Sequence, residues 1–155
     1  MIQIRDFREG DSGDLYDIDL RSFDEYFEPA VFDYFRTQWG TGQLVACDVT
    51  GRIVGFISST RLEGRRVRIM LFGVLPEYRR NGIGKMLLDA LRMRAMLEGQ
   101  LSITLEVRTS NMDARRFYRR NGFVETDILP HYYRDGGDGV RMTVQIQITI
   151  CLKRF

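Results

Sequence analysis

The strongest local signal in this chain is the stretch Val74-Leu75-Pro76-Glu77-Tyr78-Arg79-Arg80-Asn81-Gly82-Ile83-Gly84-Lys85. It leads from an apolar strand pattern into a helix pattern, with glycines at two alternate positions. Glycine lets the backbone approach a ligand closely. The first N–H groups of a helix have no acceptor within the helix, and together with the helix dipole they attract an anion. With Arg79, Arg80 and Lys85 adding charge, the stretch predicts a loop that binds a pyrophosphate.

Other phosphate-binding motifs do not fit this spacing. A dinucleotide fingerprint needs a third glycine where Leu87 stands. A nucleoside-triphosphatase loop needs Ser or Thr after Lys85, where Met86 stands. An ordinary glycine turn in front of a surface helix remains the structural alternative.

Hydrophobic periodicity places this loop inside a mixed fold. Strands are expected around residues 2–4, 44–47, 53–57, 67–71, 103–107, 123–124 and 140–150, the fourth with Val67, Ile69 and Leu71 on its buried face. Helices are expected to begin at Asp11 or Ser12, at Glu28-Pro29 with Val31, Phe35 and Trp39 in one stripe, at Gly82, and at Ser110 or Asn111. The order predicts an α/β fold with a mixed sheet and helices on both faces. Residues 1–155 are expected to form a single domain.

Composition narrows the classes of function. The 155 residues include 23 basic and 21 acidic side chains, a net charge of +2 that disfavours direct nucleic-acid binding. No apolar run approaches a membrane span, and no signal peptide is visible. Cys47 and Cys151 form no disulfide framework, which predicts a reducing, cytoplasmic location. One histidine, His131, makes a metal site improbable, so no metal is expected.

Several motifs together resemble one family. The pattern Arg79-x-x-Gly82-x-Gly84 resembles the acetyl-coenzyme-A pyrophosphate motif of the GNAT N-acetyltransferase superfamily. The matching positions downstream are Leu105-Glu106-Val107-Arg108, Asn111, Ala114, Phe117-Tyr118, Gly122-Phe123, His131-Tyr132-Tyr133-Arg134-Asp135-Gly136, Asp138 and Met142. This tail resembles the branch of protein N-terminal (Nα) acetyltransferases, including the ribosomal-protein-alanine type and its archaeal-like members. The match covers about residues 44–145.

The resemblance implies the GNAT fold, acetyl-CoA as cosubstrate, and a set of residues that bind it. A bulge at Phe72, Gly73 and Val74, for which Gly73 is suited, would splay the strand so that the pantetheine arm pairs with its backbone. The Val74 N–H would polarise the thioester carbonyl. Residues 80–85 (Arg80, Asn81, Gly82, Ile83, Gly84 and Lys85), preceded by Arg79, would hold the pyrophosphate. Asn111 would bind the pantetheine or acetyl end; its alternative role is a helix cap.

The resemblance also implies two catalytic residues. The amine must lose a proton to attack, and the thiolate must gain one to leave. Tyr118 stands at the position of the tyrosine that protonates the thiolate; the alternative is a core tyrosine. Glu106 stands at the position of the proposed base, pointing off the core face toward the splayed strands. Its alternative is a surface carboxylate paired with Arg108.

Proton chemistry favours an α-amine as acceptor. At pH 7 about 10% of free α-amines are neutral, but only about 0.04% of lysines. A lysine therefore needs a further ~3.5 kcal/mol of help with deprotonation. A modest carboxylate base suffices for the α-amine, although lysine acetyltransferases use the same fold.

The segment from Asp14 to Trp39 stands apart in charge. Its seven acidic and two basic residues give a net charge of −5, so the remainder carries +7. It also holds eight aromatic residues: Tyr16, Phe23, Tyr26, Phe27, Phe32, Tyr34, Phe35 and Trp39. In the family this region and the loop before the last strand form the acceptor groove. An acidic, aromatic wall attracts a cationic peptide N-terminus. The expected acceptor contacts are Phe23, Glu25, Tyr26, Tyr132 and Tyr133; the alternative is that these residues are core or solvated surface.

The loop before the last strand departs from the family pattern, and several functional alternatives are kept. Gly139 stands where the branch usually has alanine, and with Gly136 and Gly137 it is expected to loosen one groove wall. The alternative functions are acetyl transfer to a small amine or a protein lysine, and non-catalytic acyl-CoA binding. Cys47 and Cys151 match no nucleophile position, so direct transfer in a ternary complex is expected. A monomer or homodimer, an auxiliary subunit and a ribosome contact are left open.

Overall fold

A computed structural model describes residues 1–22 and 27–146 of the chain. Its strands are β1 (Gln3–Asp6), β2 (Gln43–Cys47), β3 (Ile53–Leu62), β4 (Arg66–Val74), β5 (Ser102–Arg108), β6 (Val124–Leu129) and β7 (Gly139–Gln145). Its helices are α1 (Ser12–Ser22), α2 (Pro29–Gln38), α3 (Ile83–Leu97) and α4 (Met112–Arg120), with short 3-10 turns at Gly40–Gly42 and Pro76–Tyr78. The predicted order of elements is confirmed.

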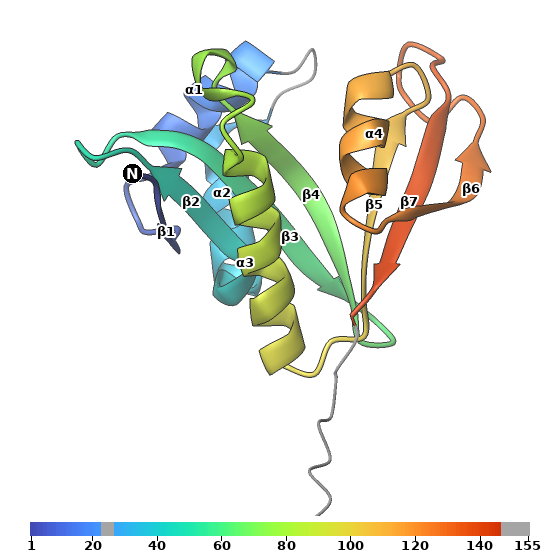
Figure 1. Cartoon of the computed structure of the whole chain (residues 1–155), viewed down its shortest axis with the longest axis horizontal. Coiled ribbons are helices and arrows are strands. Elements are labelled where there is room, and N and C mark those ends of the chain that lie inside the picture. Colours follow the sequence, from blue (N-terminus) through green and yellow to red (C-terminus); the bar gives the residue numbers. More distant parts are fainter. Residues whose placement is uncertain (23–26, 147–155) are drawn as a thin grey trace, which may run out of the picture.

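The strands form one seven-stranded sheet in the order β1-β2-β3-β4-β5-β7-β6. All neighbouring strands are antiparallel except β4 and β5, which are parallel and joined by the crossover helix α3. Figure 1 shows α3 in front of the strands of the first half, α1 and α2 behind them, and α4 against β5. The predicted mixed sheet with helices on both faces is therefore correct. Among the described residues, no helix is long and apolar enough to cross a membrane.

The parallel pair separates after three residues. Backbone pairing of β4 with β5 ends at Arg68 and Thr104, although β4 continues to Val74 and β5 to Arg108. Figure 1 shows the two strands diverging upward, so that the sheet opens into two halves. The unpaired edges of β4 and β5 face each other across this opening. The functional side chains considered below lie along its two faces.

A β-bulge on β4 decides on which face of the sheet each later side chain of this strand lies. Ser59 pairs with Ile69 and Ser58 with Leu71, so Met70 is an extra residue. The prediction of a bulge at Gly73 is wrong, because Gly73 pairs regularly with Phe56. Side chains alternate along a strand, so the extra residue reverses the faces beyond it.

Two expected side-chain positions change as a result. Phe72 turns toward α3 and α4, where its ring packs against Phe117 of α4. Leu71 leaves the face it was predicted to share with Val67 and Ile69, and it is only half-buried. A strand without the bulge would have placed Phe72 on the same face as Arg68.

The core fills both sides of the first half of the sheet. On α3, the predicted stripe Leu87, Leu88, Leu91 and Ala95 is fully buried. On α2, the predicted stripe is wrong in part: Phe32 is buried and packs edge-on against Phe56 at 5.6 Å between centroids. Val31 and Phe35 are half-buried. The last predicted strand is confirmed up to Gln145, and residues 147–150 of it lie outside the described part.

Candidate functional site

The free edge of β4 offers backbone groups to the opening. Leu75 N donates to Val54 O at 2.8 Å, which makes Gly55 and Val74 a non-hydrogen-bonded pair. The N–H of Val74 is therefore directed away from β3, to the side from which β5 has diverged. The same alternation directs the N–H and C=O of Phe72 that way. This edge can accept an extended ligand as an added strand.

The start of α3 presents backbone N–H groups that have no acceptor within the helix. These N–H groups, which form the predicted pyrophosphate site, are called the cradle below. The first intrahelical bond runs from Met86 N to Gly82 O, so the N–H groups of residues 83–85 come before any helical acceptor. Gly82 has φ 75° and Arg80 has φ 65°, both in the left-handed region. The turn thus needs the glycine at 82, and it directs the helix N-terminus toward the loop. The predicted helix start at Gly82 is confirmed.

The side chains of this loop mainly hold its shape. Asn81 Nδ2 donates to the carbonyl oxygens of Tyr78 and Arg79, and Arg79 Nε donates to Val74 O at 3.1 Å. Tyr78 Oη bonds the Asp48 carboxylate at 3.1 Å. Lys85 pairs with Asp89 one turn along its own helix at 2.7 Å. Two of the three expected basic side chains, Arg79 and Lys85, thus bind groups of the protein itself.

Aromatic rings line the α3–α4 side of the opening. Phe72 lies 5.9 Å from Phe117 and 6.3 Å from Tyr118 between ring centroids, and Tyr118 lies 5.5 Å from Phe123. A Cβ placed on Gly84 would meet the Phe117 ring at 3.4 Å, so the glycine lets the helix start pack close to these rings. The result is an apolar wall beside the cradle.

Tyr118 keeps its proton in this setting. Burial raises the pKa of its phenol above the ordinary value of 10, and the nearby Tyr133 raises it further. A protonated hydroxyl can donate to a leaving group. The placement fits the predicted acid, whose catalytic role stays a prediction.

Asn111 is the N-cap of α4. Its Oδ1 accepts a hydrogen bond from Ala114 N at 3.2 Å. Of the two predicted caps, Asn111 rather than Ser110 is observed. Its role toward pantetheine stays a prediction, because capping occupies the oxygen and leaves Nδ2 as the donor for a ligand.

Glu106 lies on the other face of the opening, in a charged network. One carboxylate oxygen accepts from Arg68 Nε at 3.0 Å, and the other accepts from Arg141 Nε at 3.3 Å. The Glu106 side chain is 8% exposed. It therefore points off the core face beside the splayed strands, as predicted. Pairing with Arg108, the predicted alternative, is not what the structure shows.

The β6–β7 loop carries both expected tyrosines. Their rings meet edge-on at 5.1 Å, and Tyr132 Oη accepts from Arg68 Nη2 at 3.1 Å. The Arg108 guanidinium lies 4.1 Å above the Tyr133 ring and forms an ion pair with Asp135. A hydrogen bond from Gly137 N, followed by that from Arg108, lowers the pKa of the Asp135 carboxyl.

The expectation that glycines loosen this wall stays a prediction, and the structure shows hydrogen bonds within the loop. His131 N donates to the Asp138 carboxylate at 2.9 Å, and Tyr133 N donates to Gly137 O at 3.1 Å. A Cβ on Gly139 would lie 3.3 Å from the rings of both tyrosines. The glycine therefore allows the tyrosine pair to pack closely on the strand.

The acidic, aromatic segment supplies less surface charge than its composition suggested. Asp19 is fully buried and accepts from Phe27 N at 2.9 Å. Burial raises the pKa of its carboxyl, an effect partly offset by that hydrogen bond. Phe32 and Trp39 belong to the core. The predicted acceptor contacts Phe23, Glu25 and Tyr26 lie outside the described residues.

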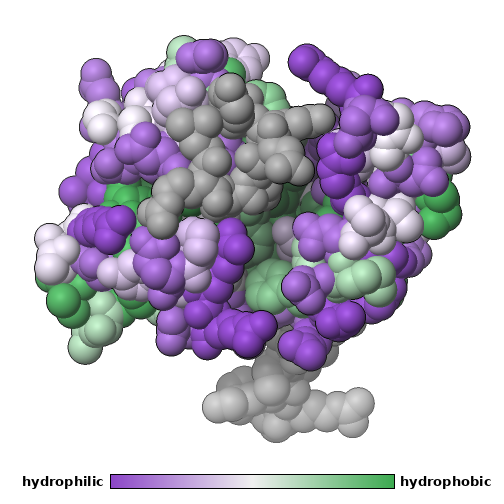
Figure 2. Space-filling model, turned by 90° about the horizontal axis from the view of Figure 1, so that it is seen from above, coloured by the Kyte–Doolittle hydropathy of each residue, from purple (hydrophilic) through white to green (hydrophobic). Residues whose placement is uncertain are grey.

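The opening is visible as a hollow in the molecular surface. Figure 2 looks down on it: the surface is hollowed between the two halves, with hydrophobic side chains in the hollow and hydrophilic ones on both sides. The described site thus has an apolar interior and a polar rim. This arrangement suits a ligand that is buried in part and held at its ends by polar groups.

Sequence reasoning missed the partners of Glu106. Arg68 and Arg141 stand on strands whose pairing with β5 is set by the tertiary fold. A partial signal was present, since an arginine on the polar face of an otherwise apolar strand needs a partner. The sequence did not say which carboxylate that partner would be.

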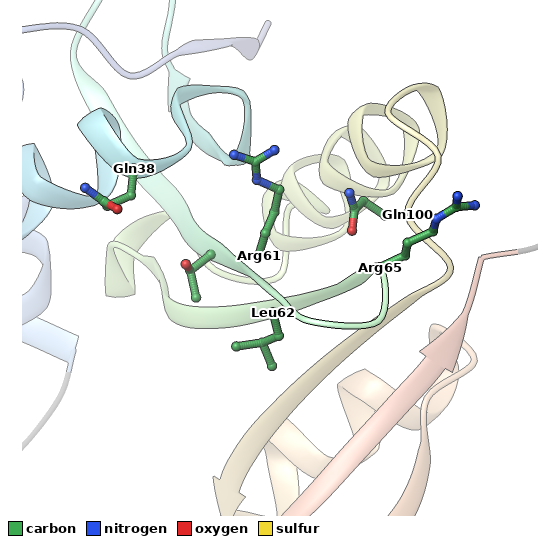
Figure 3. Close-up of a pocket in the computed structure, with 6 residues that line it drawn as sticks. Gln38, Arg61, Leu62, Arg65 and Gln100 are labelled. Atoms are coloured by element: carbon green, nitrogen blue, oxygen red, sulfur yellow. The ribbon is translucent and has the colours of Figure 1, made fainter.

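A separate pocket lies at the other end of the sheet. Figure 3 shows it beside the β3–β4 hairpin, with Gln38, Arg61, Arg65 and Gln100 around it and Leu62 pointing away. It contains none of the predicted site residues. Within residues 1–22 and 27–146, no three His, Cys, Asp or Glu side chains gather in a way that could hold a metal ion.

Known proteins share this fold and this arrangement of the site, and they are acyltransferases. Residues 13–123 match the model of the acetyltransferase (GNAT) family, so the chain belongs to that family. The N-alpha-acetyltransferase of Sulfurisphaera tokodaii is 32% identical over 158 aligned positions, covering 93% of each chain.

Two solved structures extend the comparison. The crystal structure of Ard1 from Thermoplasma volcanium superposes with a TM-score of 0.90 at 36% identity, covering 95% of this chain and 99% of that one. Naa50 of Arabidopsis thaliana, solved with the bisubstrate analogue CoA-Ac-MVNAL, has a TM-score of 0.81 at 26% identity, covering 92% and 97%. The family predicted from the sequence motifs is confirmed.

Proposed function

We propose that this protein transfers the acetyl group of acetyl-CoA to the α-amino group of protein or peptide N-termini. The observation that carries the proposal is the placement of Glu106 and the tyrosine pair on one face of the opening, with the anion cradle and the free β4 edge on the other. A cofactor and an acceptor can thus meet in the opening from opposite sides. The N-alpha-acetyltransferase relative and the peptide-bearing analogue bound to the Arabidopsis neighbour support the choice of acceptor.

The residues present fit acetyl-CoA. The N–H groups at the start of α3 suit its pyrophosphate, and the N–H and C=O groups along β4 suit the amides of its pantetheine arm. Phe72 and Phe117 would pack beside that arm. Acetyl-CoA supplies the activated acetyl thioester, so the protein needs no covalent intermediate of its own.

Two side chains would manage the protons. Glu106 would accept the proton that the amine loses on attacking the thioester, directly or through a water. Tyr118 would donate its proton to the sulfur as the carbon–sulfur bond breaks. The N–H of Val74 would stabilise the negative charge that develops on the thioester oxygen.

The acceptor is expected to enter past Tyr132 and Tyr133. Phe23, Glu25 and Tyr26, in the acidic segment opposite, remain proposed contacts. A cytoplasmic place of action is also proposed, since the buried thiol of Cys47 fits a reducing compartment. The proposal includes a monomer or homodimer as the working form, alone or with an auxiliary ribosome-bound subunit.

Acetyl transfer to a peptide panel tests the proposal. The peptides begin with Met, Ser, Ala or Glu, each carries an internal lysine, and a matched copy has a blocked N-terminus. Mass spectrometry locates the acetyl group. Acetylation of the α-amine, lost in the blocked copies, is expected. Acetylation of lysine, or tight acetyl-CoA binding without transfer to any peptide, would overturn the α-amine assignment and point to lysines, small amines or a non-catalytic role.

A further inference from the structure

Arg68 connects three parts of the molecule at the point where the opening between β4 and β5 begins. It stands on β4 at the last position paired with β5, opposite Thr104. Its Nε donates to Glu106 on β5, and its Nη2 donates to Tyr132 in the β6–β7 loop, at 3.0 and 3.1 Å. Beyond Arg68, the backbones of β4 and β5 are no longer paired. This guanidinium therefore bridges the two halves where the main chain stops doing so.

The planar guanidinium suits this bridge. Its N–H groups leave in fixed directions, so binding Glu106 through one nitrogen sets the direction of the bond to Tyr132 through another. A lysine ammonium has no such fixed fork. Because the Glu106 side chain is 8% exposed and that of Arg68 is 31% exposed, the ion pair is partly shielded from water.

Arg141 has a different geometry. It is the register partner of Glu106 on β7, and its second contact is with Asp127 on β6 at 3.5 Å. Both of its contacts lie within the second half of the sheet. Arg141 thus neutralises Glu106, whereas Arg68 also ties Glu106 to the acceptor loop.

We propose that Arg68 is a positioning residue, whose guanidinium holds the Glu106 carboxylate and the Tyr132 hydroxyl in one fixed arrangement. The proton-accepting oxygen and the acceptor wall then keep a constant relation when a peptide binds. This inference rests on the proposed function, in which Glu106 is the base and Tyr132 contacts the acceptor. One side chain on β4 would then affect both kcat, through Glu106, and the KM for the acceptor, through Tyr132.

Steady-state kinetics of Arg68→Met and Tyr132→Phe, alone and together, test the link. Arg68→Met is expected to lower kcat at least tenfold and raise the peptide KM, with the acetyl-CoA KM unchanged. Tyr132→Phe adds little in the Arg68→Met background, because the link is already broken. Arg66→Met is the matched control: Arg66 lies on the same strand, and its Nε binds the Glu63 carbonyl instead.

Chemical rescue separates positioning from folding. Arg68→Ala is expected to regain kcat in millimolar guanidinium chloride but not in equal sodium chloride, with a melting temperature close to that of the wild type. Arg68→Lys keeps the charge but recovers less than half of the wild-type kcat, since it lacks the fork.

Two results would overturn the assignment while leaving the proposed function intact. One is an Arg68→Met enzyme with wild-type kcat on α-amines. The other is independent, multiplying effects of Arg68→Met and Tyr132→Phe together with a loss that guanidinium does not restore. A wild-type enzyme that does not acetylate α-amines counts against the proposed function instead. In that event the same variants are assayed on whichever amine is acetylated.

Discussion

The two faces of the opening between β4 and β5 are built in different ways. On the α3–α4 face, backbone N–H groups from one continuous stretch form the cradle, and aromatic rings back it. On the opposite face, charged and hydroxyl side chains from β4, β5, β7 and the β6–β7 loop meet around Glu106. A backbone cradle binds a fixed ligand with little dependence on side chains. A side-chain network is sensitive to each of its members, and it can be changed to suit a different acceptor.

Substitution of Glu106, the proposed base, should show this sensitivity most strongly. Glu106→Gln is expected to lower kcat by about a hundredfold or more, in the range for loss of a general base. The acetyl-CoA Kd, measured by calorimetry, should stay within about twofold, since the residue faces away from the cradle. An undiminished kcat would remove Glu106 as base and make its network purely structural.

Tyr118 joins the two faces in the proposed mechanism, and its loss should be the next largest effect. Tyr118→Phe keeps the ring among Phe72, Phe117 and Phe123 but removes the proton, so kcat is expected to fall about ten- to hundredfold. Because burial raises the pKa of this phenol, its acid form persists through neutral and mildly alkaline pH. The pH–rate profile of the wild type should then show no fall from this group below about pH 10. A decline at lower pH that Tyr118→Phe abolishes would contradict this assignment.

Removing the second tyrosine of the loop should affect the acceptor alone. Tyr133→Ala is expected to raise the peptide KM about tenfold, corresponding to ~1.4 kcal/mol of lost binding, with the acetyl-CoA KM unchanged. Tyr133→Phe, which retains the ring beneath Arg108, is the matched variant and should lose less. Equal rises in both KM values would show that the two faces are not separable in this way.

On the cradle side, a change in backbone conformation should matter more than a change in charge. Gly82→Ala places a Cβ at φ 75°, a conformation that costs an L-residue roughly 1–2 kcal/mol. The acetyl-CoA KM is expected to rise about fivefold or more, as ~1 kcal/mol predicts, while the peptide KM stays constant. Gly99→Ala, at φ 73° near the other end of α3, imposes the same strain away from the site. Equal effects of both changes on the acetyl-CoA KM would indicate general destabilisation instead.

The smallest effect concerns Asp19, the buried carboxylate within the acidic segment from Asp14 to Trp39. Burial raises the pKa of Asp19 in the folded state, so the charged carboxylate opposes folding. The free energy of unfolding therefore declines as pH rises above the ordinary pKa of an aspartate. Asp19→Asn is expected to raise Tm at pH 8 by about 2–4 °C, corresponding to ~1 kcal/mol. The gain should decline as pH falls through the ordinary aspartate pKa and disappear below about pH 3, where the carboxyl is protonated in both states. A gain that does not depend on pH would exclude this electrostatic origin.

Much of the fold could be predicted because its signals are local. The stripe on α3 and the cap at Asn111 follow from helical periodicity and from a side chain that satisfies a helix terminus. The glycines of the loop between Val74 and Lys85 reveal the cradle for the same reason, because its N–H groups lie within a few residues of one another. Glu106 could also be placed on its face from strand alternation alone.

The rest depended on contacts between distant segments. One extra residue, Met70, reverses the faces of β4, so simple alternation misplaced Leu71 and gave no reason to bring Phe72 to α4. On α2, it is packing against Phe56 that selects Phe32 over the predicted stripe.

The sequence by itself determined the order of elements, the free N–H groups at the start of α3 and the family, since each follows from short motifs whose residues lie a few positions apart. Only the tertiary structure decided which side chains meet Glu106. Arg68 and Arg141 are separated from it by 38 and 35 positions, and a parallel and an antiparallel register bring them to its two oxygens. Local propensity carries no information about such register, because the free energy that fixes it comes from packing and pairing across the whole sheet.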